Sequence, residues 1–304
     1  MKRLNRLYIF CFVLLFAFVE TQAQTTIEKP NLGVPSKIGP AYFGPNAFPV
    51  PDMLDGRTSS ELKLELYGDC FLGTTTGNVA DDITGDIFAK LTIPLFTPKA
   101  NLTVWMPIFE YFYTSAEVNA LRRLPTPYNT QDLQGMDSGD VYVSADVRIL
   151  SQEKHYIDMA ARAVLKTASA NQFAKGRCYD SPGYFFDVAM GHSINLIGGN
   201  HYLRLAASAG FLCWQTDNGR QNDAVMYGAM LAYRLKRFSI DATFGGYTGW
   251  ERDGDRPMTL KTNITYHIDN LSLRLGYQVG FRDWPYHQIR VGASYAFNIF
   301  SHKR

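Results

Sequence analysis

The chain has 304 residues and a formal net charge of +2, with 46% hydrophobic and 14% aromatic residues. Its 30 basic and 28 acidic residues nearly balance, which excludes the strong basic excess of a nucleic-acid-binding protein. Tyr and Phe are abundant, and no apolar run beyond the N-terminus is long enough for a transmembrane helix, so the composition favours strands.

The first 23 residues have the three parts of a secretory signal peptide. A basic opening, Met1 to Arg6, precedes an apolar run over 7–19, and small residues lead to a predicted cut after Ala23. The apolar run is short for a membrane-crossing helix, so a retained anchor is the less favoured alternative. No Cys follows the cut, which argues against a lipoprotein signal. The removed segment carries three basic residues and one acidic residue, so the mature chain is formally neutral.

Residues 24–60 do not alternate in polarity and hold a Pro about every five residues. Because Pro cannot donate to a sheet ladder, we expect an extended, irregular arm. Two interpretations remain open for this arm. It is a disordered periplasmic tail, or it forms a partial plug in the structure that follows. The second fits its aromatic residues, which disordered tails usually lack: Tyr42, Phe43 and Phe48.

Strand-length segments of alternating polarity recur from residue 61 to about residue 300. In 271–282 and again in 288–299, apolar residues occupy the odd positions and polar or small residues the even ones. Earlier alternation begins at 62–67 and 86–95, and further segments lie at about 100–112, 139–150, 155–167, 184–194, 201–214, 223–235, 237–249 and 257–268. The pattern predicts an all-β fold, a transmembrane antiparallel up-and-down β-barrel over 61–300 with about twelve strands, within a range of ten to fourteen.

Connection lengths separate this barrel from a soluble β-sandwich, which also alternates. The connections after even-numbered strands are short: 97–99, 151–154, 197–200, 236 and 269–270. Those after odd-numbered strands are mostly longer: 73–81, 114–138, 168–183, 216–222 and 251–256, with the short 283–285 as the exception. Short periplasmic turns and longer outer loops are typical of outer-membrane barrels, and a sandwich has no reason to sort its loops by parity.

Aromatic residues on the apolar faces crowd the strand ends, while Leu, Ile, Val and Ala occupy the middle. Rings prefer the headgroup level of a membrane, so two belts are expected. The predicted periplasmic belt contains Tyr233, Phe238, Tyr266, Tyr295 and Phe297, and the predicted outer belt contains Phe186, Phe211, Tyr227 and Phe281.

The opposite faces of the strands define the predicted lumen, which carries more basic than acidic residues. The acidic set is Glu65, Asp69, Asp86, Asp146, Asp158, Asp187 and Asp241. The basic set is Lys63, Lys90, Arg148, Arg162, Lys166, Arg204, Arg234, Lys261, Arg274, Arg282 and Arg290. One interpretation is structural filling by ion pairs, such as Asp146 with Arg162 and Asp158 with Arg148. The other is a passage for anions, with Arg204, Arg234, Arg274 and Arg290 as successive contacts.

The segment Val291 to Phe297 alternates and ends on an aromatic residue, as the terminal assembly signal of outer-membrane proteins does. With the strand pattern, it makes the chain resemble Gram-negative outer-membrane β-barrel proteins of porin-like architecture. The chain departs from that pattern by running on past the aromatic residue, through a short tail at 301–304. The resemblance implies an outer-membrane location with both termini periplasmic, and contacts with outer-membrane lipid and the barrel assembly machinery.

The preferred functional hypothesis is a narrow channel or uptake pore for small solutes, either anionic or neutral. Twelve-stranded porins for acidic oligosaccharides have a similar architecture. One alternative is a lipid-modifying enzyme of the phospholipase or lipid A deacylase type. It is disfavoured because alternation places His192 and Ser193 on opposite faces, where they cannot pair. Another is a structural, receptor or adhesion barrel using the loop 114–138, in which 117–124 reads as a short helix. No catalytic residue, nucleic acid, cofactor or metal site is predicted, and the oligomeric state stays open.

Three Cys remain after the predicted cut, so they cannot all pair. Cys178 lies in a predicted outer loop and Cys213 near the outer end of the adjacent strand. A disulfide between Cys178 and Cys213 is one possibility, and free buried thiols are the other.

Overall fold

The computed structural model describes residues 43–95, 97–170, 175–177, 182–196, 201–215, 221–250, 252 and 254–297. The predicted signal peptide, Tyr42, Cys178 and the tail 301–304 lie outside this described part. The strands are β1 (Leu62–Gly73), β2 (Asp82–Pro94), β3 (Ala100–Thr114), β4 (Leu133–Asp137), β5 (Tyr142–Leu150), β6 (Asp158–Lys166), β7 (Gly183–Asn195), β8 (His201–Gln215), β9 (Gln221–Leu235), β10 (Phe238–Gly249), β11 (Met258–Ile268), β12 (Leu271–Arg282) and β13 (Tyr286–Phe297). Three short helices are η2 (Val79–Asp81), α2 (Ala116–Leu121) and η3 (Tyr128–Thr130).

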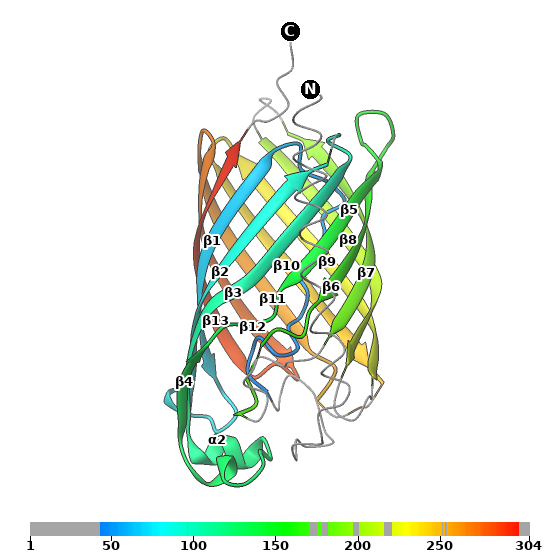
Figure 1. The fold of residues 1–304 in the computed structure, drawn as a ribbon. Helices are drawn as coiled ribbons and strands as arrows, with labels where there is room; N and C mark the ends of the chain where they lie inside the picture. The colour runs from blue at the N-terminus through cyan, green and yellow to red at the C-terminus, as the bar shows by residue number, and fades with distance from the viewer. Residues whose placement is uncertain are drawn as a thin grey trace, which may run out of the picture.

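Twelve of these strands form a closed antiparallel barrel (Figure 1). Each wall strand pairs with the next, and β1 pairs with β13, so that Leu62 lies opposite Phe297 and Gly73 opposite Tyr286. β4 pairs only with the far part of β3, while the near part of β3 pairs with β5. The prediction of an up-and-down barrel with about twelve strands is confirmed, and β4 is an addition inside the loop 114–138.

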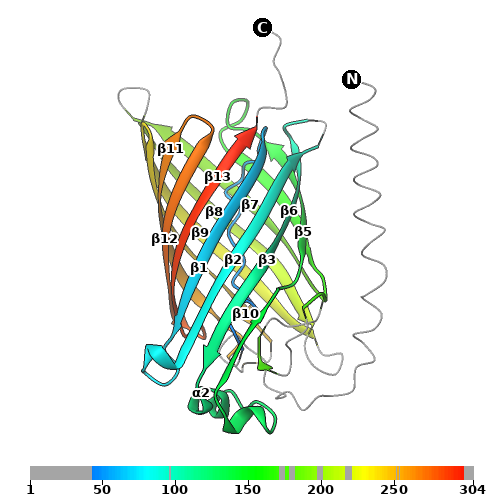
Figure 2. The ribbon, with the colours of Figure 1, turned by 60° about the vertical axis from the view of Figure 1, so that its left-hand side comes forward.

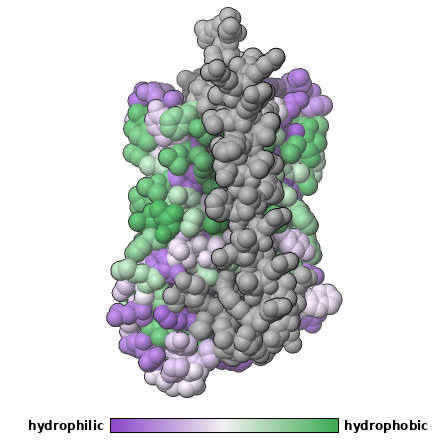
Figure 3. All heavy atoms as spheres, viewed as in Figure 1, coloured by the Kyte–Doolittle hydropathy of each residue, from purple (hydrophilic) through white to green (hydrophobic). Residues whose placement is uncertain are grey.

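Alternation along each strand places apolar side chains on the outside of the barrel and polar side chains on the inside, which is the reverse of a soluble protein. On β1 and β13, Leu66 and Val291 are 53% and 62% exposed on the outside, while Glu65 and Ser294 are each only 8% exposed on the inside. Figure 3 shows hydrophobic residues gathered over the strands and hydrophilic ones toward both ends. Since a soluble protein does not expose a continuous belt of Leu, Ile and Val, this wall fits lipid on its outer face.

The aromatic belts follow from the strand register. Phe238 on β10 packs against its partner Tyr266 on β11 with ring centroids 4.7 Å apart, and Tyr295 contacts Phe297 at the same distance. At the other end of the strands, Phe186 stacks on its register partner Phe211. Aromatic residues thus contact one another at both ends of the strands, at positions predicted for the two belts.

The barrel has two unlike ends. The turn end, where β1 begins and β13 finishes, carries the two-residue connections Lys236–Arg237 and Asp269–Asn270. The loop end carries α2, η2, η3 and the β3–β4 hairpin, which projects beyond the wall (Figures 1 and 2). Short turns face the periplasm in outer-membrane barrels, which assigns the turn end to the periplasm. Among the described residues, no helix has the length and apolar character needed to cross a bilayer.

The N-terminal arm, described from Phe43 onward, runs inside the barrel from the loop end to the turn end (Figures 1 and 2). At the loop end, the carbonyl oxygen of Phe43 accepts a 2.8 Å hydrogen bond from the Tyr286 hydroxyl. At the turn end, the amide of Ser59 donates to the Asn101 side chain over 2.7 Å. The predicted periplasmic position of the mature N-terminus concerns residues outside the described part.

The loop half of the lumen contains an apolar cluster that the arm completes. Phe43 and Phe48 are 0% and 2% exposed, and their rings meet edge to face with centroids 5.5 Å apart. The wall contributes Tyr142, Val164, Phe185, Leu212, Trp214, Ala224, Met226 and Tyr247. Burial of these rings stabilises the docked arm, because the aromatic side chains would otherwise face water.

Candidate functional site

The inward-facing positions of the strands form rows of charged and polar side chains around the lumen. One row crosses from Asp241 through Asn263, Gly276, Arg290 and Asp69 to Asp86. Of the eighteen predicted lumen residues, Arg282 is 53% exposed at the loop end of β12. Twelve others occupy inward positions of their strands: Asp146, Arg148, Asp158, Arg162, Lys166, Asp187, Arg204, Arg234, Asp241, Lys261, Arg274 and Arg290. Most of the strongly buried charges lie in contact with an opposite charge on a neighbouring strand or on the arm.

Two arginines make two-pronged contacts with carboxylates. Arg290 donates to both oxygens of Asp69 over 2.7 Å each. Arg162 donates to both oxygens of Asp187 over 2.8 and 2.9 Å. The expected pairing of Arg162 with Asp146 is wrong, although the two residues lie opposite each other on β6 and β5. Arg162 turns to its other neighbour on β7 because from there it also reaches the Asp52 carbonyl oxygen of the arm, over 2.8 Å.

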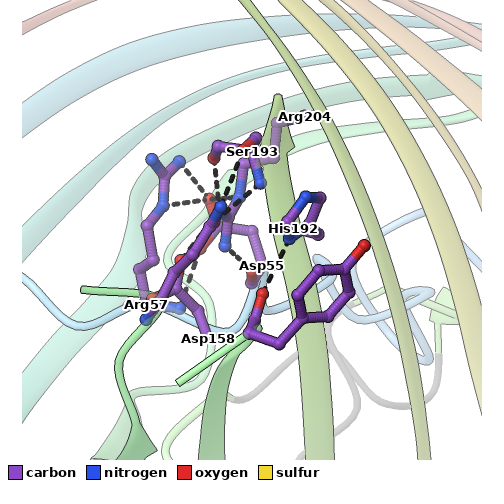
Figure 4. Close-up of polar contacts among 8 residues, drawn as sticks. Asp55, Arg57, Asp158, His192, Ser193 and Arg204 are labelled. Atoms are coloured by element: carbon purple, nitrogen blue, oxygen red, sulfur yellow. Dashed lines mark hydrogen bonds and ion pairs between the residues drawn. The ribbon is translucent and has the colours of Figure 1, made fainter. Parts of the chain in front are cut away.

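Arg204 joins three elements near the turn end (Figure 4). Its guanidinium is fully buried and donates to Asp158 over 2.9 Å and to the Ser193 hydroxyl over 2.8 Å. It also lies 3.5 Å from the Asp55 carboxylate of the arm. The expected pair of Asp158 with Arg148 is therefore wrong, because Asp158 faces Arg204 across β7. Arg57 forms its own ion pair with Asp55 and reinforces this end of the arm.

Buried ion pairs also close the loop end. The Arg122 side chain, from the segment after α2, reaches into the barrel mouth and contacts Asp82 and the Tyr286 hydroxyl. Arg177 contacts Glu110 over 2.9 Å and the Thr84 hydroxyl over 2.7 Å.

A further buried pair joins the wall to the segment between β4 and β5, where Lys166 pairs with Asp140. Burial raises the pKa of Asp140, and the Lys166 ammonium opposes that rise.

Beside the arm lies a lumen cavity of about 510 Å³. It reaches from beneath the apolar cluster to residues near the turn end such as Thr92 and Asn101. Its wall includes Lys63, Lys90 and Arg274, whose amino and guanidinium nitrogens lie 3.2, 3.7 and 3.9 Å from the single carboxylate of Glu65. Three cations thus share one anion. Their side chains stay about one-third exposed to the cavity, at 31%, 33% and 37%.

The arm supplies charged groups that the sequence did not mark as part of a site. Asp52 forms ion pairs with Lys261 and Arg290, and Asp55 pairs with Arg204. Nearer the loop end of the arm, the Asn46 side-chain amide donates to Asp86 over 2.8 Å and to Glu110 over 2.6 Å. One signal pointed to such partners. Eleven basic against seven acidic predicted lumen residues leave a cationic surplus, and Asp52 and Asp55 lie in the segment 24–60, for which a partial plug is one of the two interpretations.

The described residues contain one chain in which an imidazole lies between two hydroxyls. Ser239 lies 3.1 Å from one nitrogen of His267, and Ser272 lies 2.9 Å from the other, on the lumen face near the turn end. His192 instead stacks on Tyr156 outside the barrel, while Ser193 faces Arg204 inside, as alternation predicts (Figure 4). No carboxylate completes either arrangement among the hydrogen bonds of the described residues.

Of the two cysteines in the predicted disulfide, only Cys213 belongs to the described part. It is a buried free thiol at the loop end of β8. Cys178 lies outside the described residues, and the free thiol of Cys213 agrees with the second of the two possibilities named from the sequence.

No family model matches this sequence, and no curated protein matches it either. Among solved structures, the chain is similar to the KdgM porin, at 10% identity and a TM-score of 0.44, over 77% of this chain and 99% of that one. It is also similar to the NanC porin, at 10% identity and a TM-score of 0.48, over 76% and 98% of the two chains. A third similar structure is LpxR from Salmonella typhimurium, at 9% identity and a TM-score of 0.48, over 77% and 100%. Such distant likenesses carry no functional argument, and the closed twelve-stranded barrel rests on the strand pairing of this chain itself.

Proposed function

We propose that the protein is an outer-membrane channel or uptake pore for small anionic solutes. The observation that carries this proposal is the cavity of about 510 Å³ with Lys63, Lys90 and Arg274 gathered on its wall around one carboxylate. Seven basic and seven acidic residues line the cavity as a whole, so the positive excess is local to the three cations around Glu65, where it attracts anions and repels cations. Rings of basic side chains are how anion-selective pores discriminate between ions.

The arm makes this a restricted pore. In the described part of the loop half, Phe43, Phe48 and their wall partners fill the lumen, while the basic cavity lies toward the turn end. A solute that crosses must therefore move past the arm or shift it. An uptake pore with an internal plug fits this arrangement better than a wide diffusion channel.

The test is the reversal potential of the mature chain in planar bilayers under a salt gradient. The triple variant K63Q/K90Q/R274Q should lose most of its preference for anions, because it removes the shared cations and leaves Glu65. A matched control, K99Q/K154Q/R237Q, removes three exposed basic residues at the turn end and should retain the preference. Absence of conductance from both the mature chain and a chain lacking 43–57 would contradict the proposal.

The role proposed here is passage rather than catalysis. A lipid hydrolase acting on the outer leaflet needs its nucleophile at the outer membrane face, whereas Ser239 and His267 lie inside the lumen near the turn end. Purified protein should therefore not release fatty acid from phospholipid or lipid A. Robust turnover that is lost in Ser239→Ala would replace the channel proposal with an enzymatic one.

A further inference from the structure

A carboxylate of the chain itself occupies the middle of the lumen. Asp52 forms ion pairs with Lys261 on β11 and with Arg290 on β13, the latter over 3.8 Å. The Asp52 side chain stays 53% exposed to the cavity, whereas Lys261 and Arg290 are only 18% and 12% exposed. The two cations are thus built into the wall, and the anion that meets them is presented from the lumen side.

The two cations differ in what they would retain without the arm. Arg290 keeps its two-pronged contact with Asp69 on the neighbouring strand. Lys261 makes its one salt bridge within the described residues to Asp52. Loss of Asp52 would leave a mostly buried ammonium without a carboxylate in salt-bridge contact, and only the weaker electrostatic interactions with Asp69 and Asp241 would offset its charge. Because such a charge is costly unless it is paired, another anion would be drawn to the same place.

We propose that Lys261 and Arg290 form a carboxylate-binding site and that Asp52 is its built-in occupant, which a solute carboxylate displaces together with the middle of the arm. This inference rests on the proposed function and names the class of solute. The solute carboxylate has to compete with the Asp52 carboxylate, which is tethered to the site and has an effective concentration on the order of millimolar. A solute with a single carboxylate would compete poorly.

The same cavity offers a second anchor. Lys63, Lys90 and Arg274 line it together with Lys261 and Arg290. Lys261 lies opposite Gln278 on β12, and Arg274 is four residues along that strand toward the turn end, or roughly 13 Å at the rise of a β-strand. A solute with two carboxylates at opposite ends of a flexible chain can therefore reach both sites. The ligand class is a dicarboxylate of intermediate length or a larger polyacid.

Binding is tested by calorimetry on the purified mature protein, with suberate as the probe, succinate as a shorter diacid and 1,6-hexanediol as an uncharged control. Suberate should bind more tightly than succinate, and the diol should not bind. D52N should lower the dissociation constant for suberate about tenfold or more, because the tethered competitor is gone. K261Q should abolish the effect of D52N. The control D269N, which removes an exposed carboxylate in the β11–β12 turn outside the arm and the cavity, should leave the dissociation constant unchanged.

Arm movement has its own test. An added Cβ at Gly228 would lie 3.1 Å from Cγ of Met53, so M53C with G228C, in a background lacking the native cysteines, places two thiols within disulfide reach. Oxidation should suppress suberate binding, and reduction should restore it, while each single variant binds under both conditions. Equal binding by oxidised and reduced protein, or no effect of D52N, would overturn the inference. Since binding is measured without transport, these outcomes are independent of whether the pore conducts.

Discussion

The buried charged residues inside the barrel line the lumen, and their ion pairs also link neighbouring strands. Asp187 is fully buried as a side chain, and its charge is met by the two-pronged contact from Arg162. Such a pair adds little net stability over an apolar pair of the same shape, but loss of one partner leaves an uncompensated charge in a poorly solvated place. The position of each arginine therefore matters more than the total lumen charge.

Arg162→Met should destabilise the barrel by about 3 kcal/mol, because it leaves the Asp187 carboxylate buried without its cation. The double variant R162M/D187L should recover much of that loss, since it removes the stranded charge. Urea unfolding in lipid vesicles measures both. R282Q serves as the control: Arg282 is 53% exposed and lies 3.8 Å from Asp283, so its removal should change stability by less than about 1 kcal/mol. Equal losses in R162M and the double variant would contradict this account.

At the scale of elements, the arm and the wall are fitted to each other at positions that lack side chains. A Cβ at Gly191 on β7 would overlap the Arg204 guanidinium and lie 2.6 Å from the Asp55 carbonyl oxygen. Only glycine lets the arm backbone approach this strand so closely. The apolar cluster at the loop end and this close approach at the turn end hold the arm at two separate places.

Gly191→Ala should loosen the turn-end half of the arm while leaving the barrel folded. Cleavage by trypsin after Arg57, whose side chain is 44% exposed, should become several-fold faster. Gly85→Ala on β2 provides the matched control, because nothing lies within 4 Å of the added Cβ there. Cleavage at the same rate in both variants would show that the close contact at Gly191 does not hold the arm.

On the scale of the whole molecule, the barrel separates two environments, with apolar residues facing lipid and charges facing the lumen. Leu275, near the middle of β12, is 54% exposed on the outer face, whereas Thr92 on β2 lines the cavity. An arginine costs much more on the lipid face at mid-membrane than in a wet lumen.

Leu275→Arg should therefore destabilise the folded barrel by about 2–4 kcal/mol in vesicles, and Thr92→Arg by clearly less. Urea titration of the two variants in the same lipid gives the comparison. A larger loss for Thr92→Arg would reverse the assignment of the inner and outer faces.

Local pattern was enough to predict the wall. Period-2 alternation and loop parity determined the strand count, the lipid face and the inward position of residues such as Arg204 and Arg290, because strand geometry alone fixes which side a residue faces. The same alternation correctly separated His192 from Ser193.

Partner choice was decided only by the tertiary structure. Arg162 has a carboxylate opposite it on each neighbouring strand, and the sequence could not tell that it turns to Asp187. The course of the arm was equally inaccessible, since an irregular Pro-rich segment has no period that fixes its position. Its place follows from long-range contacts of Phe43, Phe48 and Asp52 with strands far along the chain. Strand geometry is local and can be predicted from the sequence, whereas ion pairing and plugging depend on which distant groups barrel closure brings together.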